Sequence, residues 1–556
     1  SRTGYYEKDV ANYDAYNVKV SGGLYYKIKE NIEASLIGYW GMGSTVYTGF
    51  DRYNLKNFKL GQYKAEVKSD NWFLRAYTTQ ENSGDSYTAT ISSVRINEAW
   101  KSNTNWFQQY IGTYGAARAQ GLNDAQAHAT ARGAADNGRF LPGTAAFKNA
   151  FDSITNRSIT DGGGKFADKS GMYHFEGQYN LSDEIKVLDV LVGANYRIYH
   201  LNSDGTIFAD TAGAININEY GAYVQAARRL FNDVLKLTGS IRYDKNENFK
   251  GRFTPRVTAL VGVAKDNNIR LSFQTAYRFP STQDQWINLN SPSARLIGGL
   301  PEFNTFFNFS GNPLYTAESV AAYRGSFAAG SPNPALLQQA PFVTVKPETM
   351  NSYEVGYRGL IQKRLLVDAY VYYSVYKNFL AKVAAARGTS GNPAGAPAEL
   401  LNPGTTENFS FPVNTTENVK AFGWGISADY LLPSNYVVNA NVSGDQLDDL
   451  QPGLIAFFNT PKVRFNVGFS NSNVYKNFGF NFIYRWQDKL LWEGTFGSAE
   501  IPAYGTLDGQ ISYTLRKSKS IIKLGASNLT NNYYRSAFGN PYVGGLYYVS
   551  FGYNVF

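Results

Sequence analysis

Residues 269–278 read IRLSFQTAYR, and in this stretch apolar and polar side chains alternate one by one. Successive side chains of a β-strand point to opposite faces, so the stretch predicts a strand with one apolar and one polar face. The same alternation recurs at residues 235–243, 365–375, 463–470 and 478–486. The repetition from the middle of the chain to its end favours an all-β architecture.

The length of these strands separates a membrane barrel from a soluble sandwich, whose strands also alternate. They run about 9–13 residues, against about 5–6 in soluble sheets, and match a tilted membrane crossing. Aromatic residues stand at both ends of the apolar faces, as they do in interface girdles. Connections alternate between very short and very long. Together these features predict a large antiparallel transmembrane β-barrel in an outer membrane.

Composition agrees with one repetitive architecture. Of 556 residues, 43% are hydrophobic, 15% aromatic and only 17% charged, with no break that would divide the chain into domains. No run of about 18 apolar residues exists that would form a membrane helix. The mean hydropathy of −0.34 suits a barrel that is polar inside and apolar outside. We therefore assign residues 1–556 to one barrel domain.

Charge and cysteine content exclude several classes of function. The net charge is +9, but the Lys and Arg residues are dispersed and form no patch or motif for nucleic acid. Cysteine is absent, which excludes disulfides, thiolate metal sites and a cysteine nucleophile. The histidines are His128, His174 and His200, too widely spaced for a metal motif. We expect no metal, no cofactor and no enzymatic activity.

The connections orient the barrel. Short polar turns, such as Ser182-Asp183-Glu184 and Asp266-Asn267-Asn268, alternate with long excursions near 80–170, 279–348 and 379–416. Outer-membrane barrels have short periplasmic turns and long external loops, so the excursions are expected outside the cell. The first contains an expected helix from Asp124 to Arg132, capped by Asn123, and another around 105–118.

Counting the strands gives about 19 in this sequence. The first, near residues 15–29, leads into a tight turn and therefore runs toward the periplasm. Because a barrel chain starts in the periplasm with an outward strand, we expect at least one further strand upstream. Plugged outer-membrane transporters have about 22 strands, so about three more strands would complete the number. We also expect an upstream plug and signal peptide.

Several motifs resemble those of the TonB-dependent outer-membrane receptors, of the Bacteroidetes type. They are Lys346-Pro347-Glu348-Thr349 before Tyr353-Glu354-Val355-Gly356-Tyr357-Arg358, Ala276-Tyr277-Arg278-Phe279-Pro280, Ile501-Pro502-Ala503-Tyr504 before Leu507-Asp508, and Gly525 to Tyr534. Their order and spacing toward the C-terminus carry the resemblance, which covers essentially the whole chain.

The resemblance implies a role and partners. Such receptors bind a scarce or bulky nutrient outside the cell, and TonB, acting through an N-terminal plug, drives its import. Neither a plug nor a TonB box is present in these residues. Outer-membrane lipid, lipopolysaccharide and a surface lipoprotein are further implied partners. Two alternatives stay open: a non-import barrel, as in a porin or a secretion or assembly complex, and a soluble β-rich adhesin or lectin.

Two groups of residues are candidates for the functional site. Exposed aromatics in the excursion 279–348 could grip a ligand, although each could also simply pack the loop. These candidate substrate-binding residues are Trp286, Phe303, Phe306, Phe307, Phe309 and Tyr315. Charged residues on the polar parity of the strands face the lumen, where guanidiniums need acceptors and could hold the plug. The candidates for lumen and plug contact are Arg242, Arg270, Arg278, Glu354, Arg358, Arg464 and Arg485, with Asp368 and Asp508 as further acceptors.

Overall fold

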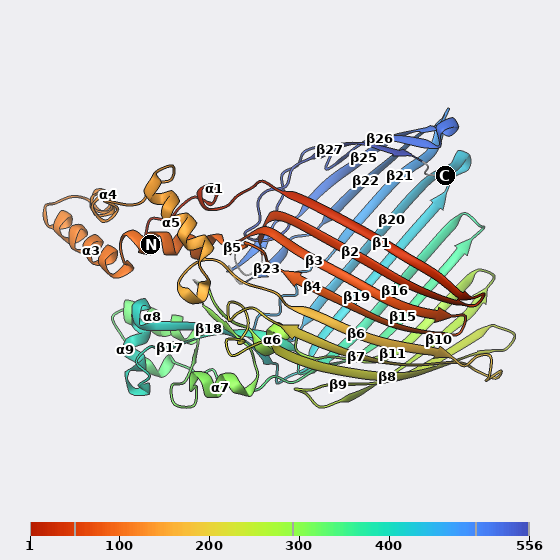
Figure 1. Ribbon diagram of the computed structural model, residues 1–556, viewed down its shortest axis with the longest axis horizontal. Helices are drawn as coiled ribbons and strands as arrows, with labels where there is room; N and C mark the ends of the chain where they lie inside the picture. Colours follow the sequence, from red (N-terminus) through yellow and green to blue (C-terminus); the bar gives the residue numbers. More distant parts are fainter. Residues whose placement is uncertain (1, 49–51, 292–293, 495–496, 554–556) are drawn as a thin grey trace.

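The computed structural model describes residues 2–48, 52–291, 294–494 and 497–553. A 20-stranded antiparallel sheet dominates it, with each long strand hydrogen-bonded to the next along the chain (Figure 1). Its long strands are β1 (Tyr16–Lys29), β2 (Ile32–Thr48), β3 (Arg52–Ser69), β4 (Trp72–Asn82), β6 (Gly171–Asn180), β7 (Asp189–Leu201), β8 (Ile215–Leu230), β9 (Leu235–Asn246), β10 (Arg252–Ala264), β11 (Asn267–Arg278), β15 (Glu348–Ile361), β16 (Leu365–Lys377), β19 (Val419–Leu431), β20 (Tyr436–Asp448), β21 (Arg464–Tyr475), β22 (Phe478–Gln487), β25 (Tyr504–Leu515), β26 (Ser520–Ser527) and β27 (Leu546–Tyr553). The expected number of about 19 long strands agrees with this sheet, whose additional member is the two-residue β5 (Tyr87–Thr88) beside β3.

The alternation that predicts the strands also sorts their two faces. Leu271 on β11 is 46% exposed and lies across from Ala259 and Val355, which continue an apolar outer face. Its neighbour Ser272 lies across from Thr258 and Glu354 on the polar face. An exposed apolar face is stable only against lipid, so this face is the membrane surface.

Tight turns join the strands at one end of the sheet. Several hold non-glycine residues at positive φ, among them Asn232 (54°), Asp266 (60°) and Ser434 (60°). Asn and Asp tolerate this left-handed conformation better than most residues, and polar turns of this kind suit the periplasmic end.

The long connections gather at the opposite end of the sheet, to the left in Figure 1. The described α-helices are α1 (Glu7–Val10), α2 (Ala89–Trp100), α3 (Asn103–Ala119), α4 (Asp124–Ala135), α5 (Ala145–Asn156), α6 (Thr282–Trp286), α7 (Pro301–Phe307), α8 (Ala317–Ala328) and α9 (Ala396–Leu401). The described 3₁₀ turns are η1 (Ile159–Asp161), η2 (Pro334–Leu336), η3 (Pro393–Gly395), η4 (Pro403–Thr405), η5 (Pro433–Asn435) and η6 (Arg516–Ser518). Among the described helices, none combines the length and apolar character needed to cross a membrane. Both helices expected in the first excursion are confirmed as α3 and α4, and Asn123 caps α4 through a capping box with Gln126.

The excursions 279–348 and 379–416 fold together rather than forming separate loops. They build a five-stranded sheet in the order β12-β13-β18-β17-β14. Its strands are β12 (Asn288–Asn290), β13 (Arg295–Ile297), β18 (Thr406–Asn414), β17 (Leu380–Gly388) and β14 (Tyr315–Thr316). A separate hairpin, β23 (Leu490–Gly494) with β24 (Gly497–Ile501), rises from the connection between β22 and β25. The outer end of the sheet is therefore covered by helices, a five-stranded sheet and a β-hairpin.

Residues before β1 lie at this same outer end. The Arg2 guanidinium donates to the carbonyl of Asn97 at 2.7 Å, and the Tyr5 hydroxyl donates to the carbonyl of Phe140 at 2.9 Å. These contacts tie the segment to the helical connection between β5 and β6. The first long strand consequently runs from the outer end toward the tight turns, as the sequence predicts.

Candidate functional site

The lumen arginines find acceptors within the sheet itself. The Arg270 guanidinium donates to Glu354 through Nε at 2.9 Å and Nη2 at 2.6 Å, and the Arg485 Nε donates to Asp508 at 2.8 Å. The remaining pairs are Arg242–Asp244, Arg278–Glu348, Arg358–Asp368 and Arg464–Asp445. The expectation that these guanidiniums pair with lumen carboxylates is confirmed, including the acceptors Glu354, Asp368 and Asp508. Their contact with a plug stays a prediction.

Most candidate aromatics pack the extracellular sheet. Phe303 and Phe309 are only 3% and 6% exposed and lie in one apolar core with Phe409 and Phe411. The Arg387 guanidinium lies within this core, 5.0 Å from the centre of the Phe409 ring. Trp286 and Phe307 are half-buried against the same core, Tyr315 belongs to β14, and Phe306 is 73% exposed. The structure thus brings the phenylalanines together as a packed support, and their contact with a substrate stays a prediction.

A cavity of about 710 Å³ lies among the connections at the outer mouth of the barrel. Its wall draws on connections spread around the whole sheet, which places it over the lumen. Its lining includes Tyr47, Tyr53, Phe58, Glu81, Phe166, Asp168, Ile207, Gln283, Phe457, Asn459, Trp492, Glu493, Phe538 and Asn540. A cleft of this volume, mostly apolar with a few convergent polar groups, is what a small-molecule site requires.

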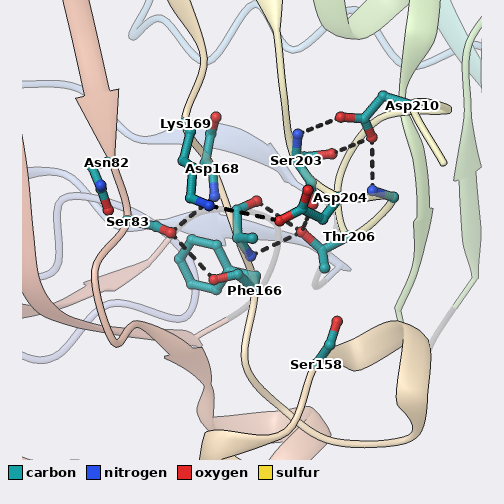
Figure 2. A network of polar contacts seen from close by, with 12 residues as sticks. Asn82, Ser83, Ser158, Phe166, Asp168, Lys169, Ser203, Asp204, Thr206 and Asp210 are labelled. Atoms are coloured by element: carbon teal, nitrogen blue, oxygen red, sulfur yellow. Dashed lines mark hydrogen bonds and ion pairs between the residues drawn. The ribbon is translucent and has the colours of Figure 1, made fainter. Parts of the chain in front are cut away.

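Figure 2 shows a network of hydrogen bonds that joins two connections, one of which contributes Phe166 and Asp168 to the cavity lining. The buried Asp210 carboxylate accepts from the Ser203 hydroxyl at 2.7 Å and from the Gly205 amide at 2.8 Å. Thr206 Oγ1 donates to the Ala167 carbonyl at 2.8 Å and so ties this turn to residues 166–170. The buried side chains of Asp210, Ser203 and Thr206 all have partners, which makes this part of the wall rigid.

The same network presents the carboxylate of Asp168 to the cavity. The Asp168 amide donates to Ser83 Oγ at 2.9 Å, and the Ser83 amide donates to the Asp168 carbonyl at 2.8 Å. Its carboxylate accepts from the Ser170 amide at 2.9 Å. Burial raises the pKa of Asp168 above its ordinary value, and the hydrogen bonds from Ser170 act in the opposite direction.

Another part of the cavity wall comes from the β20–β21 and β22–β25 connections. The Phe457 amide donates to Glu493 Oε2 at 2.9 Å, and the Asn459 side chain donates to the Glu493 carbonyl at 2.9 Å. In return the Glu493 amide donates to Asn459 Oδ1 at 2.7 Å. Phe457 and Asn459 adopt φ of 54° and 42°, so this pinned geometry holds the chain in a left-handed conformation.

The histidines lie apart from the cavity and from one another. His174 is buried in the lumen wall, where its ring stacks on Tyr77 and its Nδ1 accepts from Arg197. The His128 Nδ1 shares a 2.7 Å hydrogen bond with the Tyr110 hydroxyl on the α3–α4 hairpin. Within the described ranges of the chain, no group of three or more His, Cys, Asp or Glu residues is placed to hold a metal ion.

Sequence reasoning missed the cavity because its wall is assembled from segments hundreds of residues apart. Glu81 is the second-to-last residue of β4, and Asp168, Glu493 and Trp492 stand in connections of unremarkable composition. The one available signal was position, since outer strand ends and long connections are where a barrel binds ligands. Nothing in the sequence indicates which connections meet.

A membrane-length antiparallel sheet with an apolar outer face, a polar inner face and a crowned outer mouth defines the class: an outer-membrane β-barrel. Comparison with protein families identifies the family within this class. Residues 8–529 match the family described as TonB dependent receptor-like, beta-barrel, and the chain belongs to that family. The protein is therefore a TonB-dependent outer-membrane transporter and not an enzyme.

Solved structures support the same fold at low sequence identity. The siderophore receptor PirA from Acinetobacter baumannii is 12% identical, with a TM-score of 0.59 over 97% of this chain and 71% of that one. The copper transporter OprC is 11% identical, with a TM-score of 0.55 over 97% and 73%. The FrpB iron transporter from Neisseria meningitidis is 11% identical, with a TM-score of 0.56 over 97% and 71%. No curated protein sequence matches the chain.

Proposed function

We propose that this protein captures a scarce or bulky nutrient in the cavity at its outer mouth and imports it with energy delivered by TonB. The observation that carries the proposal is the cavity of about 710 Å³ that the connections at the outer end of the sheet enclose. A passive porin needs an open mouth and gains nothing from a rigid, mostly apolar ligand-sized cavity. The rigid wall described around Asp210 and Asn459 supports capture with little ordering cost on binding.

We further propose that additional strands and a plug complete the barrel. In the described residues β1 pairs only with β2 and β27 only with β26, so each leaves one edge of hydrogen-bonding groups unpaired. An open edge is not stable in lipid. About 22 strands, the number in plugged transporters, would close it. The paired lumen arginines would then form the wall against which the plug rests.

The proposed partners are those that membership of the family implies. TonB is expected to act on the plug, while lipopolysaccharide and a surface lipoprotein are further proposed contacts. The assignment to the Bacteroidetes type also stays a prediction, because it rests on the motifs near residues 346–358 and 525–534.

The test compares cells that express the encoded receptor in hosts with and without TonB. Both are grown in the same complex medium, and mass spectrometry measures which compounds disappear from it. The proposal expects at least one compound to be depleted only when both the receptor and TonB are present. Depletion that persists without TonB would instead support the non-import barrel, and no receptor-dependent depletion would overturn the import function.

A further inference from the structure

The cavity at the outer mouth has an electrostatic character opposite to that of the chain. The protein carries a net charge of +9. The described residues that line the cavity nevertheless include the carboxylates of Glu81, Asp168 and Glu493 and no lysine, arginine or histidine. The six lumen arginines named above each pair with a carboxylate of the sheet.

The carboxylates of the cavity differ in how far the protein satisfies them. Glu493 accepts from the Phe457 amide, and Asp168 accepts from Ser170. Glu81 is half-buried, and among the described residues no side-chain or backbone donor hydrogen-bonds its carboxylate. Glu81 also feels the negative charge of Asp168. Two neighbouring carboxylates withdrawn from water without a cation are costly, and a ligand that brings the cation removes that cost.

Aromatic rings supply most of the remaining wall. Tyr47, Tyr53, Phe457, Trp492 and Phe538 all line the cavity. The face of an aromatic ring carries negative potential and attracts an ammonium or guanidinium, with tryptophan the strongest partner. Carboxylates and ring faces therefore select the same sign of charge.

Among the described residues, Lys382 approaches the aromatic wall from outside the cavity lining. The Lys382 ammonium lies 5.7 Å from the centre of the Phe457 ring, and Lys382 is not among the lining residues. Burial lowers the pKa of Lys382 below its ordinary value.

The chemistry of the wall also separates an organic cation from a bare metal ion. Calcium and magnesium require about six or more oxygen ligands. No cluster of three or more metal-ligating side chains occurs in the part of the chain that the structure describes. The cavity volume of about 710 Å³ is far larger than an ion and falls in the range of small organic ligands.

We infer that the cavity binds an organic cation: a ligand with an ammonium or guanidinium group placed between Glu81 and Asp168 and an apolar or aromatic body stacked on the ring wall. The amides of Gln283, Asn459 and Asn540 then hydrogen-bond the neutral polar groups of the ligand. This inference names the substrate class of the import function and rests on it.

The test uses a matched pair of peptides on the purified encoded receptor in detergent. The cationic probe is N-acetyl-phenylalanyl-arginine amide, and its neutral isostere carries citrulline in place of arginine. Titration calorimetry measures both affinities. A charged hydrogen bond contributes about 1.5–3 kcal/mol, so the arginine peptide is expected to bind about tenfold or more tighter. Added salt should weaken the arginine peptide far more than the citrulline peptide.

Substitutions locate the effect. Glu81→Gln and Asp168→Asn keep side-chain size and remove the charge, and each is expected to reduce the preference for arginine over citrulline. Glu302→Gln, on the exposed first turn of α7, is the matched control and should leave it unchanged. If Glu81→Gln or Asp168→Asn fails to fold, the peptide pair and the salt series on the unaltered protein still decide the question.

Equal affinity for the two peptides, or no binding of the arginine peptide at millimolar concentration, overturns the inference. An arginine preference that survives in the folded double variant overturns it as well. Failure here is distinct from failure of the import function. If a neutral or anionic compound is depleted in a TonB-dependent way, the import function stands and only the cation selectivity is wrong. If the arginine peptide binds but no compound is depleted in a TonB-dependent way, the cation selectivity stands and the import function is wrong.

Discussion

Replacing Leu271 by arginine tests the assignment of the two sheet faces. Leu271 lies four residues beyond the start of β11, which corresponds to about 14 Å along the strand at about 3.4 Å per residue. With a tilt of about 40°, it sits about 10 Å above the periplasmic turn, close to the centre of an apolar band about 25 Å tall. Its side chain is 46% exposed and has apolar neighbours, Ala259 and Val355, on both adjacent strands.

An arginine at this depth on the lipid face costs about 2–4 kcal/mol. Ser272→Arg is the matched control, because it adds the same side chain one residue away, on the polar face beside Glu354. There the cost should stay within about 0.5 kcal/mol, as for other solvated substitutions. Urea titration of the folded fraction in lipid vesicles, scored by heat-modifiable gel mobility, measures both. Equal destabilisation by the two substitutions, or a larger effect of Ser272→Arg, would refute the face assignment.

Four further predictions follow from the contacts at the lumen and the outer mouth. Changing Arg270, Arg464 and Arg485 together to alanine removes three lumen ion pairs and should raise the leak of the plugged barrel in planar bilayers; an unchanged leak and unchanged denaturant stability would show that these arginines do not hold a plug. Because burial raises the pKa of Asp168 above 3.8, its carboxyl becomes neutral at a higher pH than a free aspartate, and affinity for the arginine peptide should fall on acidification within that higher range; titration calorimetry across pH checks this, and an affinity that rises as pH falls would contradict it. Asp210→Ala leaves the donors of residues 203–205 unpaired at about 1–3 kcal/mol, so hydrogen exchange should increase over residues 203–210, whereas exposed Asp204→Ala should change little. Arg387→Met removes one partner of a largely buried ion pair with Glu407 and should loosen the five-stranded extracellular sheet by about 3–5 kcal/mol, seen as earlier proteolysis near residues 390–405; wild-type resistance there would show that the pair is dispensable.

The sequence was sufficient for the parts of the fold that depend on local periodicity. The alternation at residues 269–278 predicted both β11 and its faces, because side-chain direction in a strand repeats every two residues. Parity also placed Arg270 and Glu354 on the same lumen face, whereas their direct pairing is set by the register of β11 and β15. The cap at Asn123 was readable because a helix start is decided within four residues.

The extracellular architecture could not be predicted in the same way. The parallel pairing of Arg295 with Phe409 joins residues from two excursions, and the bond between Phe457 and Glu493 joins two more connections. No period in the sequence specifies such partners, because they are selected by burial after the barrel has brought the connections together. Phe303 and Phe309 illustrate the consequence. The sequence around them, rich in Asn, Pro and Gly, suggested exposed aromatic side chains, whereas the fold buries both in a core.

Labelling of single cysteines in intact cells tests the central claim most directly: the protein is an outer-membrane barrel whose cavity-bearing connections face the outside. These 556 residues contain no cysteine, and the unaltered receptor, labelled in parallel, gives the background against which each introduced thiol is read. Phe306→Cys places a thiol on an exposed position of α7, and Asp183→Cys places one in the exposed turn between β6 and β7. With a large polyethylene-glycol maleimide that does not cross the outer membrane, position 306 is expected to react in intact cells and position 183 only after the membrane is permeabilised. Reaction at position 183 in intact cells, with position 306 protected, would contradict the account.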